Sequence, residues 1–156
     1  SLLQLVPNEN LQPALEDIEF DAMTITDAPR FPYRGMHLDV GRNFFEVAAV
    51  KKLMDAMAFY KLNKLHLHLT EDEGWRLDIP DLPELVEVGA RRGHTIESEA
   101  HLHPAYGSGP SPNNANSSGN GYYTKAQFIE IIQYAHDRHI EVIPEINVPG
   151  HARAAI

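Results

Sequence analysis

The chain has 156 residues, no cysteine, and 22 acidic against 13 basic side chains, which gives a formal charge of −9. This length suits one ordinary domain with a hydrophobic core. The negative charge argues against nucleic-acid binding, because phosphates need a basic face, and the lack of cysteine excludes disulfide frameworks and thiolate metal sites.

Residues 1–28 are expected to form a linker segment, because Pro7, Pro13 and Pro29 interrupt any regular element there. The first ten residues lack the basic and apolar regions of a signal peptide. No apolar run approaches the roughly 20 residues that a membrane span needs. The domain itself is expected over residues 29–156.

The first regular unit of that domain is a strand, a helix and a second strand. The strands are predicted over residues 34–40 and 64–69. Asn43 is the predicted N-cap of the helix, with Glu46 three residues on as in a capping box, and the helix runs to about residue 60. Such a unit predicts parallel strands with a right-handed crossover.

The second half of the chain starts with a short helix over residues 82–92, which Gly93 is expected to end. Residues 94–121 follow and are rich in Gly, Pro, Ser and Asn. A loop of this length in a compact domain is usually functional or disordered.

A further helix and strand complete the pattern. Thr124 and Gln127 form a second capping box for a helix that is expected to run to about residue 139. A third core strand is predicted over residues 140–146, and residues 152–156 look like the start of another helix. This α/β order predicts the first three to four βα units of a (β/α)₈ barrel, since a whole barrel takes about 250 residues.

The second strand alternates in character and then opens into carboxylates. Its leucines at 65, 67 and 69 point one way, and His66 and His68 point the other. Glu71 and Asp72 come directly afterwards. Because loops after strand C-termini hold the chemistry of parallel α/β folds, the ends of the three strands are expected to converge on one site.

Five residues at these strand ends are candidates, and each keeps a structural alternative. Arg42 suits a forked contact to sugar hydroxyls or a carboxylate, or a surface pair with a nearby Asp. Glu71 and Asp72 suit the orientation of a proton-carrying partner, or a solvated turn. His151 suits a proton shuttle or orienting donor, or a His without a role near a helix start. Trp75 suits a sugar-stacking face or a core position.

A metal site is the alternative from another class. His66 and His68 present two imidazoles on one side of a strand, as in some barrel metallohydrolases that bind zinc. Glu145, His151 or Asp72 would complete that site.

Four motifs in order resemble the catalytic barrel of family 20 glycoside hydrolases, the β-N-acetylhexosaminidases. They are RGMHLDVGRNFF (34–45), MAFYKLNKLHLHLTEDEGWR (57–76), YYT (122–124) and VIPEINVPGH (142–151). The long Gly/Asn loop is most similar to that of the bacterial chitobiases. The resemblance implies a (β/α)₈ barrel without metal or organic cofactor.

It also implies a reaction and residue roles. The family releases terminal β-linked N-acetylglucosamine or N-acetylgalactosamine with retention, and the nucleophile is the substrate's own 2-acetamido oxygen. By position, Arg42 would grip the C3 and C4 hydroxyls of the sugar. Glu71 and Asp72 match an Asp-Asp pair of the family. In the family, the first Asp of that pair and the histidine that matches His151 form a hydrogen-bonded chain that supports the general acid.

The chain departs from the family pattern in several places. Glu71 stands where Asp is usual, and its extra methylene is expected to shift the hydrogen bond by about 1 Å. Asn43 stands where His is usual, and Asn147 where Asp is usual. The resemblance places the family's adjacent Asp-Glu pair, which orients the acetamido group and protonates the leaving oxygen, on a fourth strand, and this chain is expected to end before it.

These departures set expectations for the chain as a piece of a longer enzyme. The 156-residue piece is expected to be inactive alone and to expose sheet edges and core-facing side chains, which favours oligomers or loose packing. Its partners would be an oligosaccharide that contains N-acetylhexosamine and the C-terminal half of the barrel. The parent enzyme is expected in the periplasm, in the cell envelope or outside the cell. The remaining alternative is a glycan-binding half-barrel without turnover.

Overall fold

The computed structural model describes residues 20–95 and 100–156. The chain divides into two units, Ser1–Arg30 and Phe31–Ile156. Residues 20–30 of the first unit contain neither helix nor strand. The predicted linker, residues 1–28, lies mostly outside the described residues, so its division from residues 29–156 stays a prediction.

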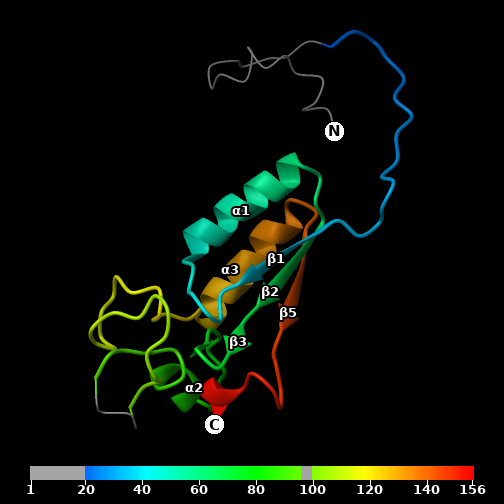
Figure 1. The fold of residues 1–156 in the computed structure, drawn as a ribbon. Helices are drawn as coiled ribbons and strands as arrows, with labels where there is room; N and C mark the ends of the chain where they lie inside the picture. The colour runs from blue at the N-terminus through cyan, green and yellow to red at the C-terminus, as the bar shows by residue number, and fades with distance from the viewer. Residues whose placement is uncertain (1–19, 96–99) are drawn as a thin grey trace. The chain divides into compact units, whose positions relative to one another are not determined.

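Three parallel strands form the sheet of the second unit: β1 (Gly35–Asp39), β2 (Lys64–His68) and β5 (Glu141–Glu145), in the order β1-β2-β5. The predicted βαβ unit and the third strand are therefore confirmed. Beyond the end of β2, the short strands β3 (Thr70–Glu71) and β4 (Gly74–Trp75) pair antiparallel. β3 and the C-terminal turn lie at the end of the sheet where β2 and β5 finish (Figure 1).

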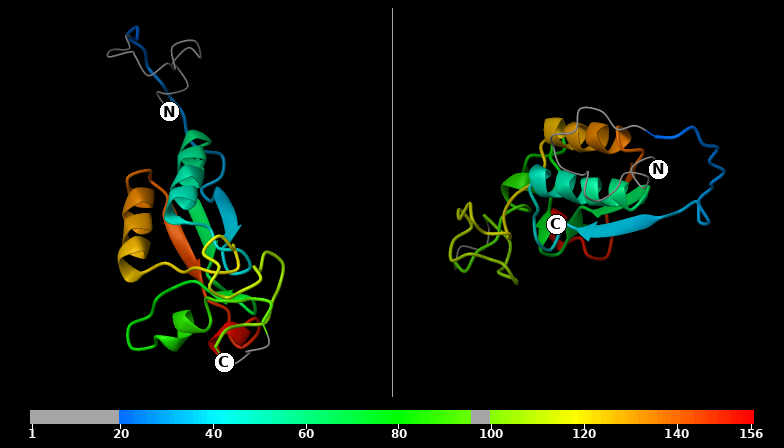
Figure 2. Two further views of the ribbon diagram at one scale, coloured as in Figure 1. Left: turned by 90° about the vertical axis from the view of Figure 1, so that its left-hand side faces the viewer. Right: turned by 90° about the horizontal axis from the view of Figure 1, so that it is seen from above.

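Two helices cover one face of this sheet: α1 (Val47–Phe59) and α3 (Lys125–His136) (Figure 2). The core lies between the helices and the sheet, and Leu65, Leu67 and Leu69 of the β2 segment are fully buried in it. α1 contributes three buried side chains, and α3 contributes two; they are Val50, Met54, Met57, Ile131 and Ala135. The alternation along β2 thus sends leucines to the core and leaves both histidines on the opposite face.

The two predicted capping boxes have different outcomes. At α3 the Thr124 side chain accepts from the backbone N–H of Gln127, and the Gln127 side chain accepts from that of Thr124, so this prediction is confirmed. At α1 the prediction was wrong, because the N-cap is Glu46 and no side chain caps it. Asn43 instead accepts a hydrogen bond of 2.9 Å from the Ser118 hydroxyl, far along the chain.

Other predicted helices were too long. The helix expected over residues 82–92 is only α2 (Glu84–Glu87), and α3 ends at His136 because the chain leaves helical geometry before His139, whose φ is +57°. The last predicted helix is a short 3₁₀ turn, η3 (Arg153–Ala155). Within the described part of the chain, no helix has the length and apolar character to cross a bilayer.

Two buried arginines tie the irregular segments to the sheet. Arg76 is fully buried and donates to five backbone carbonyls at 3.0–3.2 Å, those of Val40, Gly41, Ala90, Gly119 and Gly121. Burial and repulsion from Arg92 lower the pKa of Arg76 to about 9, so it is still a cation at neutral pH. One guanidinium therefore joins the end of β1 to the segments around residues 90 and 120.

Arg92 has the same role in the long Gly/Asn loop. It is also fully buried, and it donates to the carbonyls of Glu73 (2.8 Å), Arg42 (2.6 Å) and Tyr106 (2.6 Å) and to the Ser108 hydroxyl (3.0 Å). The described part of the loop, residues 100–121, is therefore held against the carboxyl ends of β1 and β2. Its only regular pairing there consists of isolated bridges.

Candidate active site

Glu71 is the centre of the candidate site. Its side chain is 2% exposed, and both of its oxygens are bound. Oε1 accepts from Arg42 Nη2 at 2.6 Å, and Oε2 lies 2.8 Å from His151 Nδ1. The backbone N–H of Asp72 also donates to Oε2, at 3.2 Å. The structure thus brings Arg42, Glu71 and His151 together from three strand ends, as their positions after those strands predicted.

Arg42 is anchored on its other side by Asp39, the last residue of β1. The Arg42 backbone N–H and Nη1 donate to the two Asp39 oxygens at 3.0 and 2.5 Å. Burial acts to raise the pKa of Asp39, but the hydrogen bonds from Arg42 outweigh it and hold that pKa below its ordinary value. The same side-chain hydrogen bond raises the pKa of Arg42. Asp39 binds Nη1 of Arg42 and Glu71 binds Nη2, yet the Arg42 side chain is still 46% exposed.

His151 lies on the turn after β5 with a left-handed φ of +56°, a conformation that costs a non-glycine residue about 1 kcal/mol or more. Its side chain is 59% exposed, in contrast to that of Glu71. The extra methylene of Glu71 was expected to displace the bond to His151 by about 1 Å. The bond is nevertheless present at 2.8 Å, so the longer carboxylate reaches the imidazole.

The side chains of Asp72 and Trp75 lie outside this set of contacts. Asp72 is exposed, and one of its oxygens accepts from the backbone N–H of Arg153 at 3.1 Å, which holds the turn after β5. Trp75 is 8% exposed and packs with Val86, Ala90 and Ala154, and its indole N–H donates to the Leu77 carbonyl at 2.6 Å. The structure therefore gives Trp75 the core position that was the alternative, and its sugar-stacking role stays a prediction.

A second polar cluster on the same face of the sheet was only partly foreseen. His68 Nδ1 lies 3.0 Å from Glu145 Oε1, and His68 Nε2 lies 3.1 Å from Glu71 Oε1. His66 and His37 also face Glu145, through its other oxygen. The alternation along β2 indicated that the two histidines share a face, but the role of His37 depends on its register opposite His66.

Two groups of side chains have the composition of a metal site within the described residues. They are His37, His66 and Glu145, and Glu71, Asp72 and His151, each with ligand atoms within 4.8 Å of one another. The two histidines proposed for zinc do not fall in one group, because His66 belongs to the first group and His68 belongs to neither. His68 instead directs both ring nitrogens at carboxylates.

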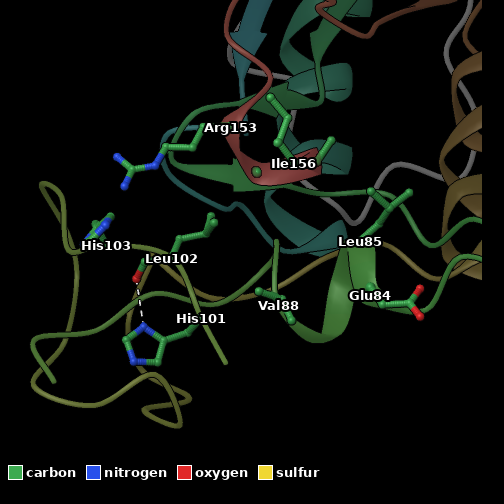
Figure 3. A pocket seen from close by; sticks show the side chains of 10 residues that line it. Glu84, Leu85, Val88, His101, Leu102, His103, Arg153 and Ile156 are labelled. Atoms are coloured by element: carbon green, nitrogen blue, oxygen red, sulfur yellow. Dashed lines mark hydrogen bonds between the residues drawn. The ribbon is translucent and has the colours of Figure 1, made fainter. Parts of the chain in front are cut away.

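A separate cavity lies elsewhere in the described part of the chain. It has a volume of about 460 Å³ between α2, residues 101–103 and the C-terminal turn (Figure 3). Arg153 and Ile156 line it, whereas Arg42, Glu71 and His151 do not. The candidate site is therefore a cluster on the strand ends and not this cavity.

Comparison with known proteins fits this geometry. The model of the catalytic domain of glycosyl hydrolase family 20 matches residues 31–156. The chain belongs to this family. Among curated proteins, this family 20 chain is 56% identical over 134 residues to the N,N'-diacetylchitobiase of Vibrio harveyi and 50% identical over 135 residues to a beta-hexosaminidase of Vibrio vulnificus. The matches cover 86% of this chain but only 15% and 16% of those proteins.

Solved structures of the family agree on the fold. A Vibrio harveyi exo beta-N-acetylglucosaminidase in complex with N-acetylglucosamine matches 83% of this chain with a TM-score of 0.71 and 46% identity, over 19% of its own length. A Streptomyces plicatus N-acetyl-beta-hexosaminidase gives a TM-score of 0.66 at 44% identity, over 22% of its length. The parallel sheet of this family 20 chain is thus an α/β arrangement shared with these enzymes.

Proposed function

We propose that the protein to which this family 20 chain belongs is a retaining β-N-acetylhexosaminidase. It removes terminal, non-reducing β-linked N-acetylglucosamine or N-acetylgalactosamine from chito-oligosaccharides or glycans. The observation that carries the proposal is the pairing of Glu71 with both Arg42 and His151 at the ends of parallel strands. The names of the relatives support the same reaction class.

In this proposal Arg42 binds the sugar. Asp39 and Glu71 hold its guanidinium from two sides, so the orientation of the remaining N–H groups is fixed before substrate arrives. A planar fork of donors suits two neighbouring hydroxyls, such as those at C3 and C4 of a hexosamine. Preorganisation of this kind lowers the entropy cost of binding.

Glu71 and His151 act on the proton-transfer side of the reaction. A carboxylate on Nδ1 fixes the tautomer and orientation of the imidazole, and it favours the imidazolium form. The other ring nitrogen is then placed to hold the general acid, which other parts of the whole protein supply. The nucleophile is the 2-acetamido oxygen of the substrate, so no enzyme carboxylate attacks the anomeric carbon.

The proposal extends to architecture and location. Residues 31–156 would form the first three to four βα units of a (β/α)₈ barrel, and the exposed edges of β1 and β5 would pair with the rest of that barrel. The parent protein would act in the periplasm, in the cell envelope or outside the cell, where chitin fragments and glycans are found.

The test uses the whole protein and aryl glycosides. We expect hydrolysis of the aryl β-N-acetylglucosaminide and a loss of at least about 100-fold for the aryl β-glucoside, which lacks the nucleophilic acetamido group. Proton NMR of the first product should show the β-anomer. Release of the α-anomer, or equal rates on the two glycosides, would contradict the mechanism; sugar binding without hydrolysis would favour the glycan-binding alternative.

Metal removal separates the metal-dependent alternative from this one. The cluster of His37, His66 and Glu145 has the ligand types for a divalent cation, so the measurement is meaningful here. We expect dialysis against a chelator to change kcat by less than about twofold, because the proposed roles of Arg42, Glu71 and His151 need no Lewis acid. Loss of activity that stoichiometric zinc restores would instead support a metallohydrolase.

A further inference from the structure

His68 is a buried bridge between two carboxylates from different strands. The residue is 6% exposed and lies at the end of β2. Its Nε2 faces Glu71 Oε1 at 3.1 Å, and its Nδ1 faces Glu145 Oε1 at 3.0 Å. In the register of the sheet His68 lies opposite Asp39 on one side and Glu145 on the other, so the bridge runs across the sheet at the level of the candidate site.

The hydrogen-bond chemistry of this bridge requires a particular form of the imidazole. Ionised carboxylates only accept hydrogen bonds, and a neutral imidazole donates from one nitrogen only. Both contacts of His68 are satisfied when both ring nitrogens carry a proton. His68 is then an imidazolium between two anions, which gives two charge-assisted hydrogen bonds at a site shielded from water.

The charged and titratable neighbours balance this cation. Those on or beside His68 and its two partners are Asp39, Arg42, His37, His66, Glu71, His151 and Glu145. Burial acts to raise the pKa of Glu145, but the hydrogen bond and charge of His68, and then His66, outweigh it and lower that pKa. Glu145 is therefore an anion at neutral pH, as the bridge requires.

The bridge fixes the oxygen of Glu71 that His151 does not use. Oε1 of Glu71 is held by His68 and by Arg42 Nη2 at 2.6 Å, while Oε2 faces His151 Nδ1 at 2.8 Å. Because Oε1 is held by these two contacts, the plane of the Glu71 carboxylate is fixed. The position of Oε2 relative to the His151 ring is then fixed as well. Without His68, rotation of Glu71 about its last torsion would be opposed by Arg42, which is itself half exposed, and by the Asp72 N–H on Oε2 at 3.2 Å.

We propose that His68 is a positioning residue for the Glu71–His151 pair, and that Glu145 holds His68 in this role. The ends of β2 and β5 then carry one chain of alternating carboxylates and imidazoles: Glu145, His68, Glu71 and His151. The inference rests on the proposed function, because it assigns to His68 and Glu145 the support of the groups that the reaction uses. Neither residue needs to touch the sugar.

The decisive measurement compares kcat, KM and the pH profile of kcat in the whole protein. His68→Asn keeps a donor near the Nδ1 position, toward Glu145, and loses the contact to Glu71. We expect kcat to fall about 100-fold, with KM changed less than about threefold, since an error of ~1 Å in a positioned group costs that much. The pH profile of kcat should change as well, because the substitution removes an ionisable ring that lies 3.1 Å from Glu71 Oε1.

Three further variants show whether the effect is one of position. His68→Gln places its amide near the Nε2 position, so it should recover at least about tenfold of the lost kcat. Glu145→Gln should lower kcat about tenfold and alter the pH profile, because the amide removes the anion that lies 3.0 Å from Nδ1 of His68. His136→Asn, on an exposed histidine at the end of α3, is the matched control and should leave all three quantities unchanged.

The outcomes separate this inference from the proposed function. An inactive wild-type protein would overturn both. An active wild type together with a folded His68→Asn variant that keeps kcat within about threefold and an unshifted pH profile would overturn the positioning role alone. If His68→Asn does not fold, Glu145→Gln is the deciding variant, because it replaces one carboxylate oxygen by an NH₂ group of nearly the same size. A wild-type kcat and pH profile in that variant would also overturn the inference.

Discussion

Replacement of Glu71 by Gln is expected to lower kcat by about 10²–10⁴-fold, the range for loss of a group that orients a proton-transfer residue. The amide has no charge to stabilise the imidazolium of His151, and it can turn its NH₂ toward Nδ1, which favours the wrong tautomer. It also leaves Arg42 and His68 beside a neutral partner. Steady-state kinetics on an aryl β-N-acetylglucosaminide measure the effect.

A conservative variant and a control variant accompany Glu71→Gln. Glu71→Asp restores the shorter acid that is usual in the family, and we expect it to keep kcat within about tenfold of the wild type, because it retains a charged carboxylate for His151. Glu130→Gln removes a half-exposed carboxylate of α3 that pairs with Lys51, and should have no effect. A Glu71→Gln variant with kcat within threefold of the wild type would show that the pair with His151 is not used.

Replacement of Arg76 by Leu should cause the largest loss of stability. Leucine fills part of the space, but five carbonyls lose the Arg76 donor. Of these, the Gly121 carbonyl is only partly buried, and the Ala90 carbonyl still accepts from the Gly121 N–H at 3.1 Å. Each unsatisfied buried acceptor costs about 1–3 kcal/mol, and relaxation reduces the sum, so we expect a total near 3–5 kcal/mol. For a domain of this size the melting temperature should fall by at least about 6 °C.

Two control variants test the role of the Arg76 hydrogen-bond donors. Arg76→Lys offers three donors for five carbonyls, so its melting temperature should lie between those of the wild type and Arg76→Leu. Arg91→Leu changes an arginine that donates to the Glu87 and Pro112 carbonyls at 3.5 Å and to the exposed side chain of Asn113, and it should shift the melting temperature by less than about 2 °C. Equal effects of the two leucine variants would refute the role of Arg76.

Local pattern and local chemistry predicted much of the fold. The alternation from Leu65 to Leu69 placed β2 and identified its buried face, and the capping box of Thr124 and Gln127 located the start of α3. Both signals depend on residues within a few positions of one another. The strand ends also indicated where Arg42, Glu71 and His151 would meet, because parallel strands present their carboxyl ends at one edge.

Local sequence predicted less where distant residues decide the structure. Asn43 looked like a helix cap, but its side chain is bound by Ser118 from a loop that local sequence does not place. Trp75 is buried by Ala154 and Val86, neither of which is near it in sequence. Arg76 and Arg92 gave no signal of burial, because a single arginine usually marks the surface and their acceptors are backbone carbonyls spread along the chain.

The contact of Arg92 with the Arg42 carbonyl has a consequence for how such an enzyme can diversify. The same guanidinium binds the Tyr106 carbonyl and the Ser108 hydroxyl, so one side chain holds both the Gly/Asn loop and Arg42, the residue proposed to bind the sugar. Under that proposal, changes in the loop near Tyr106 and Ser108 would alter affinity for the sugar without contacting it. Insertions in the loop away from Tyr106 and Ser108 would leave the Arg92 contacts intact. The loop could therefore vary in length without moving Arg42.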